Sequence, residues 1–296
     1  MARDGKALFT NVNPWSQINS NILKQQNNAN QSYFFVNLES PVEDVQQSQP
    51  SLKVPGYDLC ADVGQLSVLK QGGVSLVNLA NNHKEDCGAN RSPDTRQLIE
   101  QNGIQSVGPE FASTILDTQA GKIAVIAGED VTQPVDVDAL LKAVAMARSQ
   151  SDFLIVSMHW GNEYQNGANQ RQRDLAQKLA DAGVDVLWGT HAHVLQPMGW
   201  MNSSDGSSRM LVMFNLGNLL ADQWMTSETQ QSALVTIEIK EKRITQVSVL
   251  PIQLDHASRQ LVLPDAEVTQ SIEANLGINE LIEIDLNNLN MGNNPR

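Results

Sequence analysis

The sequence has little positive charge. Its 20 lysines and arginines are outnumbered by 33 aspartates and glutamates, which gives a net charge of −13 and a pI of about 4.7. A field of that sign repels phosphate backbones and anionic lipid head groups. No cluster of basic residues interrupts it along the chain. We therefore expect neither nucleic acids nor membrane surfaces as partners.

Cysteine and long apolar runs are also scarce. Two cysteines are too few for a dense disulfide framework, so we expect two buried thiols, with a single disulfide between Cys60 and Cys87 as the alternative. No apolar run approaches the roughly eighteen residues that a transmembrane helix needs, so we expect no membrane segment in this chain. The first residues, MARDGKALFTNVNPW, have no apolar stretch of the signal-peptide type.

What is present is the composition of a globular protein. The 296 residues are 41% hydrophobic with a mean hydropathy of −0.28, and the length suits one large domain or two smaller ones. Neither an internal repeat nor a linker rich in proline and serine divides the chain. We expect one domain over residues 1–255, followed by a C-terminal extension, 256–296, that ends in a frayed tail.

Apolar runs alternate with amphipathic segments along most of the chain. The runs predict strands at 33–36, 74–80, 104–107, 122–128, 153–158, 184–189 and 210–214. The amphipathic segments predict helices at 61–71, 93–102, 136–150 and 169–183, and a surface helix that frays into a loop at 15–31. Residues 233–254 contain the charged turn EKR and predict an antiparallel hairpin. Strands that are apolar without alternation indicate an α/β sheet covered on both faces.

Polar residues gather directly after the predicted strands. Four of the five histidines follow strand ends, namely His83, His159, His191 and His193, and Glu39 follows another. Open α/β sheets collect ligands at the carboxyl ends of their strands. One such histidine alone would more often be a hydrogen-bonded structural residue, but the conjunction indicates a site. The fifth, His256, is expected on the surface.

Imidazoles with a carboxylate are typical ligands of a divalent transition metal. They suit Mn, Zn or Fe better than Mg or Ca. The spacing of His191 and His193 leaves one or two ions open. In an extended segment both side chains leave on the same side, whereas on a curling loop they diverge toward two ions about 3.5–4 Å apart. A carboxylate such as Glu39 can bridge two ions, and the chemistry is polarisation of a phosphoryl or acyl oxygen.

Five motifs in fixed order carry a family resemblance. They are NLESP, LANNHKEDCG, MHWGNEY, GTHAHVLQP and NLGNLLADQ. Together, over roughly residues 33–252, they resemble the CapA family of poly-γ-glutamate capsule synthesis proteins, which is similar to calcineurin-like metallophosphatases. The resemblance implies a metallophosphatase-like layered β-sandwich flanked by helices, and a role in capsule polymer synthesis or export. It also implies capsule synthesis proteins as partners and a location outside the cytoplasm or at the membrane.

The resemblance also implies roles for individual residues. Glu39 takes the place of the bridging carboxylate. Asn82, His159 and His191 resemble ligands of one metal and His193 a ligand of the other, while His83 resembles a histidine that protonates the leaving group. Asn81, Glu163, Asn218 and Asp222 fall in family motifs without an assigned role.

The motif that normally opens this family is not found. There, a first strand ends in Gly-Asp and the aspartate holds the first metal, whereas here the chain begins MARDGKALFT, which resembles the residues just after that strand. We therefore expect a sandwich that lacks its first strand. Either the given sequence begins after that strand, or the first metal position is weakened, with Asp4 as a poor substitute for the missing aspartate. This favours a role in capsule polymer synthesis without hydrolysis; an active metal-dependent phosphoesterase-type hydrolase is the alternative.

Overall fold

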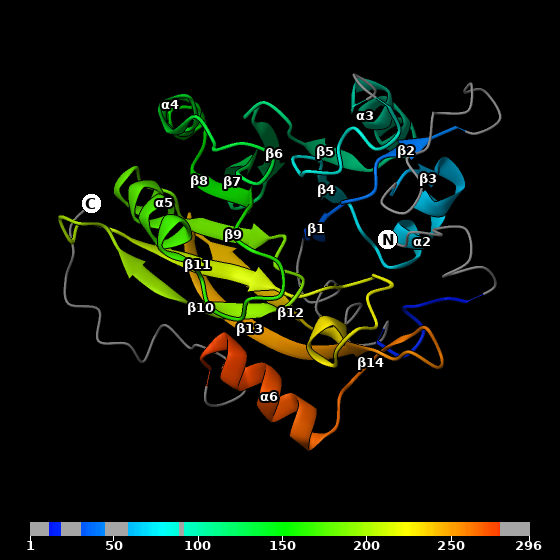
Figure 1. Cartoon of the computed structure of the whole chain (residues 1–296). Helices are drawn as coiled ribbons and strands as arrows, with labels where there is room; N and C mark the ends of the chain where they lie inside the picture. Colours follow the sequence, from blue (N-terminus) through cyan, green and yellow to red (C-terminus); the bar gives the residue numbers. More distant parts are fainter. Residues whose placement is uncertain (1–11, 19–30, 45–58, 89–91, 279–296) are drawn as a thin grey trace.

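A six-stranded sheet forms the centre of the protein (Figure 1). The computed structural model describes residues 12–18, 31–44, 59–88 and 92–278. In sheet order the strands are β10 (Leu195–Asn202), β11 (Arg209–Leu216), β9 (Val186–Thr190), β8 (Phe153–His159), β7 (Gly121–Glu129) and β6 (Thr114–Thr118). The four central strands are parallel, and the edge strands β6 and β10 pair antiparallel.

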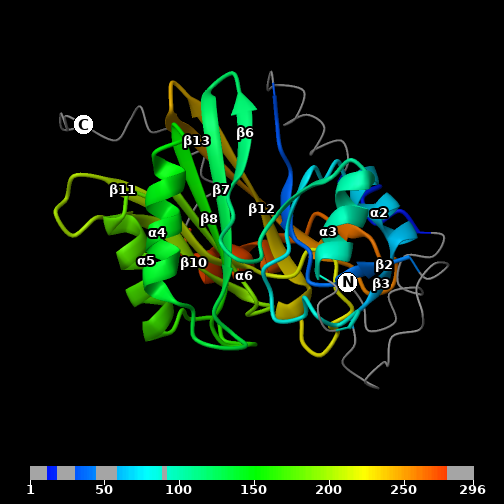
Figure 2. The same cartoon turned by 90° about the horizontal axis from the view of Figure 1, so that it is seen from above.

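Both faces of this sheet are buried, as the continuous apolar runs predicted. In β7 the side chains of Ile123 and Val125 enter one hydrophobic core, whereas Ala124 and Ile126 enter another, because successive residues of a strand point to opposite faces. Helices α4 (Val137–Arg148) and α5 (Gln170–Asp181) cover the second core, and Figure 2 shows them together on one side of the sheet. The predicted helices at 136–150 and 169–183 are confirmed.

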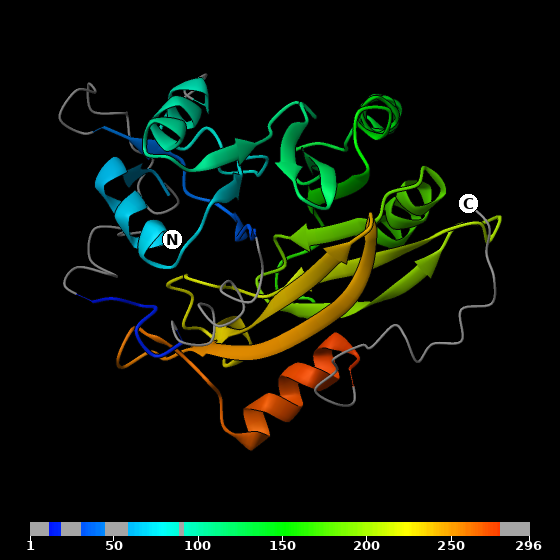
Figure 3. The same ribbon diagram turned by 180° about the vertical axis from the view of Figure 1, so that it is seen from behind.

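The opposite face packs against a second sheet. It contains β12 (Gln231–Lys240), β13 (Arg243–Leu254) and β14 (Leu261–Val262), and Figure 3 shows its long hairpin crossing in front of the central sheet. The hairpin was predicted, and both of its turn residues, Glu241 and Lys242, have positive φ, at 50° and 66°. A turn of that hand matches the twist of the strands it joins. Helix α6 (Ala266–Leu276) contacts β10, β12 and β13.

A third, smaller sheet lies beside the central one. Its parallel strands are β1 (Phe35–Asn37), β4 (Leu76–Asn78) and β5 (Gln105–Val107), with α2 (Leu66–Gln71) and α3 (Ser92–Gln101) around them (Figure 2). Two short strands, β2 (Val42–Glu43) and β3 (Ala61–Asp62), pair nearby. Asn78 Nδ2 donates to Ser157 Oγ at 3.1 Å and so connects β4 with β8, between the two sheets.

Two expectations about buried residues were wrong. Residues 15–18 belong to a turn rather than a surface helix, and both Trp15 and Ile18 are fully buried, because Trp15 packs on Gly72 and its Nε1 donates to Val68 O at 2.7 Å. Residues 19–30 lie outside the described part of the chain. The cysteines are not thiols either, since Cys60 and Cys87 form a disulfide.

The α/β class, the layered sandwich with flanking helices and the C-terminal hairpin are confirmed. The predicted helix at 61–71 begins as β3 and a 3-10 turn (Val63–Gln65), and β6, β10 and α6 were not predicted. Asp4 and the end of the C-terminal tail lie outside the described residues, and the division at residue 255 stays a prediction. Among the described residues, no helix is both long and apolar enough to cross a bilayer.

Candidate metal centre

Strand ends from the small and central sheets bring one carboxylate and three imidazoles together. Glu39 follows β1 and His83 follows β4, whereas His159 ends β8 and His193 follows β9. Oε1 of Glu39 lies 3.8 Å from Nε2 of His83, 3.8 Å from Nε2 of His159 and 3.7 Å from Nε2 of His193. The four residues span 154 positions of the chain, from 39 to 193. The three imidazoles nevertheless converge on the Glu39 carboxylate.

Asn82 and His191 complete this cluster. Asn82 Oδ1 lies 2.6 Å from His159 Nε2, and the rings of His159 and His191 have centroids 4.8 Å apart. Ligand-type atoms form two groups, each with its atoms within 4.8 Å of one another. One contains Glu39, His159 and His191; the other contains Glu163, His191 and His193. The two groups overlap at His191.

The backbone of the His-x-His segment curls rather than running straight. His191 has a φ of 100° and His193 a φ of 60°, both in the left-handed region that is costly for residues other than glycine. Such conformations cost about 1–3 kcal/mol each and cluster at functional sites. Of the two backbones that the spacing left open, the structure therefore has the curling loop. The ligand atoms of His191 and His193 still lie within 4.8 Å of each other, so one or two ions stay open.

Burial keeps the deepest imidazoles neutral. It holds the pKa of His159 well below its usual value, and the neighbouring rings of His191 and His193 lower that pKa further. Burial also lowers the pKa of His191, although the charge of Glu39 acts in the opposite direction. At neutral pH the contacts of these rings with Glu39 are therefore not ion pairs. Neutral imidazole nitrogens have the lone pairs that a metal ion requires.

His83 differs from the other rings because its pKa is raised. Burial lowers it, but the hydrogen bond to Asp86 and the charges of Glu39 and Asp86 outweigh that effect. The His83 Nδ1–Asp86 Oδ2 distance is 2.8 Å. Its other nitrogen, Nε2, faces Glu39. This histidine is therefore suited to carry a proton at the edge of the cluster.

The Nδ1 atoms of His159 and His193, which face away from Glu39, also have hydrogen-bond partners. His159 Nδ1 lies 2.9 Å from Thr190 Oγ1, and His193 Nδ1 lies 3.0 Å from Asn218 Oδ1. Asn218 Nδ2 donates to the backbone oxygen of Thr229, so its Oδ1 is the atom that accepts from His193. Nδ1 of His193 therefore carries the hydrogen, and the lone pair of Nε2 is directed toward Glu39. Distal partners of this kind fix the tautomer and orientation of metal-ligating histidines.

Two buried atoms of the cluster have no hydrogen-bond partner, namely Glu39 Oε1 and His191 Nδ1. Leaving a buried polar group unpaired costs about 1–3 kcal/mol, and more for a charged one. A cation would satisfy both atoms. Two ligands about 2.0–2.2 Å from one ion lie at most about 4.4 Å apart, and the 3.7–3.8 Å separations around Glu39 fit that limit. The residues present therefore fit a divalent transition metal.

Three further predicted residues have less central positions. Asn81 connects the backbones of the two loops that carry Glu39 and His83, because its Nδ2 donates to Leu38 O and its Oδ1 accepts from the backbone N of His83. Glu163, with a side chain 43% exposed, lies 3.9 Å from His193 at the rim. Asp222 lies in the loop that follows β11, as Asn218 does.

Sequence reasoning missed three residues that contact the cluster. Asp86 and Thr190 hold histidines, and the ring of Tyr164 stacks on His193 with centroids 5.9 Å apart. The spacing His-x-x-Asp in NNHKED was the available signal for Asp86. Tyr164 could not be recognised, because its place depends on a positive φ of 60° and on a hydrogen bond from its N to Ala192 O.

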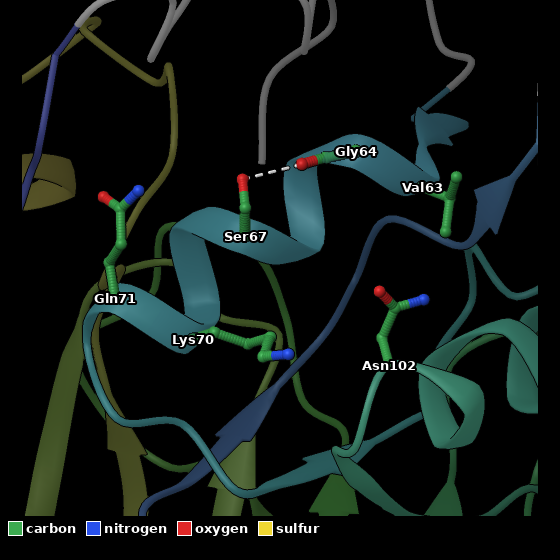
Figure 4. A pocket seen from close by; sticks show the side chains of 6 residues that line it. All are labelled: Val63, Gly64, Ser67, Lys70, Gln71 and Asn102. Carbon is green, nitrogen blue, oxygen red and sulfur yellow. Dashed lines mark hydrogen bonds between the residues drawn. The ribbon is translucent and has the colours of Figure 1, made fainter.

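A cavity of about 500 Å³ lies elsewhere, beside α2 (Figure 4). It is lined by Val63, Gly64, Ser67, Lys70, Gln71 and Asn102, none of which is a predicted site residue. Lys70 is the one charged group in that lining, and Ser67 Oγ already donates to Gly64 O at 2.7 Å. Converging ligand atoms occur at Glu39 and not in this lining. We therefore place the candidate site at the cluster.

Two relatives are described as capsule proteins. The chain is 30% identical over 254 residues to the capsule biosynthesis protein CapA of Bacillus anthracis, a match that covers 77% of this chain and 60% of that protein. It is 29% identical over 221 residues to the PGA biosynthesis protein CapA of Bacillus subtilis (strain 168), a match that covers 68% of this chain and 56% of that protein. The chain thus spans less than two thirds of the length of either relative.

A solved structure supports the fold. A hypothetical protein from Thermus thermophilus superposes with a TM-score of 0.53 at 13% identity, covering 86% of this chain and 96% of that one. At that identity the likeness concerns the fold alone. The family described as bacterial capsule synthesis protein PGA_cap matches residues 10–223, which include all the cluster residues. The chain belongs to this family of bacterial capsule synthesis proteins.

Proposed function

We propose that this chain acts in the biosynthesis or export of a capsule polymer, and that the Glu39 cluster holds one or two divalent transition metal ions for that role. Mn, Zn and Fe are the ions that this ligand set suits. Membership of the capsule synthesis family and the names of the two CapA relatives support the role. Other capsule polymer synthesis proteins are the proposed partners.

One observation carries the metal proposal. Glu39 Oε1 is buried, has no hydrogen-bond partner, and lies among three Nε2 atoms at 3.7–3.8 Å. A carboxylate in that position without a cation would be an uncompensated buried charge. The pattern is hard to explain as packing, because a structural carboxylate is normally buried with its hydrogen bonds made.

The ligand positions suggest a division between two ions. Glu39 would bridge them; Asn82, His159 and His191 would hold one, and His193 would hold the other, with Glu163 within reach. A bound ion of this type polarises a phosphoryl or acyl oxygen and lowers the pKa of its water to about 7. His83 would keep a proton at Nε2 beside the substrate, and Asn218 and Thr190 would keep their histidines in the ligating orientation.

A second candidate is an active metal-dependent phosphoesterase-type hydrolase. The observation that favours it is His83, whose raised pKa and position at Glu39 suit an acid that protonates a leaving group. Hydrolysis and polymer assembly both use a polarised oxygen. The two candidates therefore differ in whether water or another group is the acceptor.

Metal content tests the metal proposal. Purified wild-type protein should contain Mn, Zn or Fe by elemental analysis, and Glu39→Gln should lose most of it. Glu85→Gln is the matched control, because Glu85 is exposed and its carboxylate accepts from Ser92 Oγ at 3.1 Å rather than from a cluster histidine. A Glu39→Gln protein that keeps its full metal content would refute the metal site.

Capsule formation tests the role. In a strain without this gene, the wild type and Glu85→Gln should restore the surface polymer, whereas Glu39→Gln should not. Hydrolysis of a chromogenic phosphodiester by the metal-loaded wild type, lost in Glu39→Gln, would favour the second candidate. Restoration of the polymer without such hydrolysis would favour the first.

A further inference from the structure

The segment between β8 and α5, residues 160–169, places a carboxylate and an aromatic ring against one imidazole of the cluster. Glu163 Oε1 lies 3.9 Å from His193 Nε2. The ring of Tyr164 stacks on the His193 ring, with centroids 5.9 Å apart and planes inclined by 29°. Both side chains reach solvent, because that of Glu163 is 43% exposed and Tyr164 is 39% exposed. A molecule that approaches His193 from solvent can therefore touch both.

Two buried amides hold this segment in place. Gln196, on β10, is fully buried, and its Nε2 donates to Gln165 O at 2.8 Å and to Gly167 O at 3.3 Å. Its Oε1 accepts from Nε2 of Gln172, which is also buried, at 2.9 Å. Gly161 makes room for the second amide, since a Cβ there would lie 2.8 Å from the Gln172 amide atoms. Buried polar networks whose members are satisfied in this way are rigid.

The backbone of Tyr164 adopts an unfavourable conformation within this segment. Its φ is 60°, and its N–H donates to Ala192 O at 2.8 Å. Ala192 is the residue between His191 and His193. A left-handed conformation is uncommon for residues other than glycine, and such conformations cluster at active sites and ligand clamps. The fold thus holds an exposed ring beside the cluster in a strained but fixed place, as a ligand-binding surface requires.

The carboxylates of Glu163 and Glu39 have different surroundings. Glu39 has a side chain 14% exposed, and its Oε1 lies 3.7–3.8 Å from three imidazole nitrogens. Glu163 is more exposed, and its carboxylate lies near one such nitrogen only, among the ion-pair distances of the described residues. An ion in the cluster is therefore best placed at Glu39, whereas Glu163 is accessible to a molecule that arrives from solvent.

A carboxylate beside an aromatic face suits a protonated amine. The ring attracts a cation through its quadrupole, and the carboxylate accepts charge-assisted hydrogen bonds from it. The net charge of −13 favours the approach of a cation. Lys84, which follows His83, does not cancel this preference, because its Nζ is already paired with Glu129 Oε2 at 3.2 Å.

We propose that Glu163 and Tyr164 form a subsite for the protonated amino group of the molecule on which the cluster acts. The identity of that molecule as the substrate rests on the proposed function, in which the cluster polarises one of its oxygens. The subsite recognises the amino group and leaves it chemically unchanged. It therefore sets which molecules are placed at the cluster.

Methylammonium chloride is the probe that tests the subsite. At pH 7 an alkylamine is protonated. Saturation transfer by NMR from the full chain to the methyl group of the probe gives its dissociation constant. Methanol is the neutral analogue and sodium acetate the anionic one, with ionic strength held constant by sodium chloride. We expect saturable binding of methylammonium in the millimolar range and no binding of methanol or acetate at the same concentrations.

Four variants assign the binding to the two side chains. Glu163→Gln keeps the shape but removes the charge, and should weaken methylammonium binding about fivefold. Glu85→Gln makes the same change of net charge at another exposed glutamate and should retain the wild-type affinity. Tyr164→Leu should weaken binding about two- to fivefold. Tyr164→Phe should retain the affinity, because it keeps the aromatic face.

Three results would overturn the subsite. The first is equal binding of methanol and methylammonium. The second is an unchanged methylammonium affinity in Glu163→Gln. The third is a loss of affinity in Tyr164→Phe as large as in Tyr164→Leu.

A zinc titration separates the subsite from the metal centre. The carboxylate of Glu163 lies within 4.8 Å of nitrogen atoms of His191 and His193. We nevertheless expect Glu163→Gln to bind zinc as the wild type does in calorimetry, and Glu39→Gln to keep its methylammonium binding. A loss of zinc in Glu163→Gln as large as in Glu39→Gln would make Glu163 a metal ligand and overturn the subsite. The proposed function fails separately, if the wild type binds neither Mn nor Zn, because methylammonium binding is measured without added metal.

Discussion

The indole Nε1 of Trp160 donates a 3.1 Å hydrogen bond to the backbone oxygen of Phe214. Trp160 follows β8 and Phe214 lies on β11, so the side chain crosses the intervening strand β9. The crossing is at Gly189, where a Cβ would lie 2.2 Å from the indole nitrogen and 2.0 Å from the Phe214 oxygen. The glycine therefore makes this close approach possible, two residues before His191.

Gly189→Ala should destabilise the fold and disturb the cluster. The added methyl cannot be accommodated without separating Trp160 from Phe214, and overpacking of this kind costs about 1–3 kcal/mol. Denaturant unfolding measures the free energy of unfolding. Gly199→Ala is the control, because a Cβ there meets nothing within 4 Å, and we expect it to change stability by less than about 0.5 kcal/mol. Equal effects of the two variants would contradict the packing argument.

Asn218→Ala should weaken metal binding through His193. The change removes the acceptor that fixes Nδ1 as the protonated nitrogen, and losing such a partner typically lowers metal affinity about 10–100-fold. Calorimetric titration of the metal-free protein with Zn or Mn measures this. Asn202→Ala, at an exposed asparagine, is the control and should retain the wild-type affinity. An unaffected affinity in Asn218→Ala would remove Asn218 from the site.

Breaking the disulfide should lower stability substantially. Cys60 and Cys87 are 27 residues apart, and the chain-entropy relation for a loop of that size predicts a loss of about 3–4 kcal/mol. Urea unfolding of the oxidised protein and of Cys60→Ser/Cys87→Ser gives the difference. A loss below about 1 kcal/mol would show that the reduced, unfolded chain gains little freedom.

The turn between β10 and β11 should contribute pH-dependent stability. The backbone N–H and hydroxyl of Ser207 and the hydroxyl of Ser203 lower the pKa of Asp205 from 3.8 to about 2. A lowered folded-state pKa means that the charged form is favoured by folding, so this contribution is present above about pH 3.9 and is lost as the pH falls toward 2. The stability difference between wild type and Asp205→Asn should therefore shrink from pH 6 to pH 3 in denaturant unfolding. A difference that does not change with pH would contradict the assignment.

The central strands were predictable because their chemistry is local. A strand buried on both faces, such as β7 or β8, is apolar at most positions whatever its neighbours are. The edge strand β10 was not predictable, since it contains Pro197 and Gly199 and resembles a loop in isolation. Trp15 was misjudged because its burial depends on residues far along the chain, among them Val68, which is 53 positions away.

The site was predictable to the extent that it follows strand ends. Glu39 and the four clustered histidines occupy such ends, so their sequence positions indicated convergence. Asp86 and Thr190 could not be assigned, because hydrogen-bonding residues at those positions are common and only the distances to His83 and His159 distinguish them. The pairing of the cysteines likewise required the fold to bring residues 60 and 87 together.

The cluster draws its side chains from two sheets. Glu39, Asn82 and His83 belong to loops of the small sheet, and His159, His191 and His193 to the ends and loops of the central one. An ion bound by both groups of side chains would cross-link the two sheets, so that separating the sheets would first require release of the ion. Each tenfold excess of free ion over its dissociation constant adds about 1.4 kcal/mol to the docked state. The concentration of free metal would then contribute to the stability of this protein, independently of any reaction that it performs.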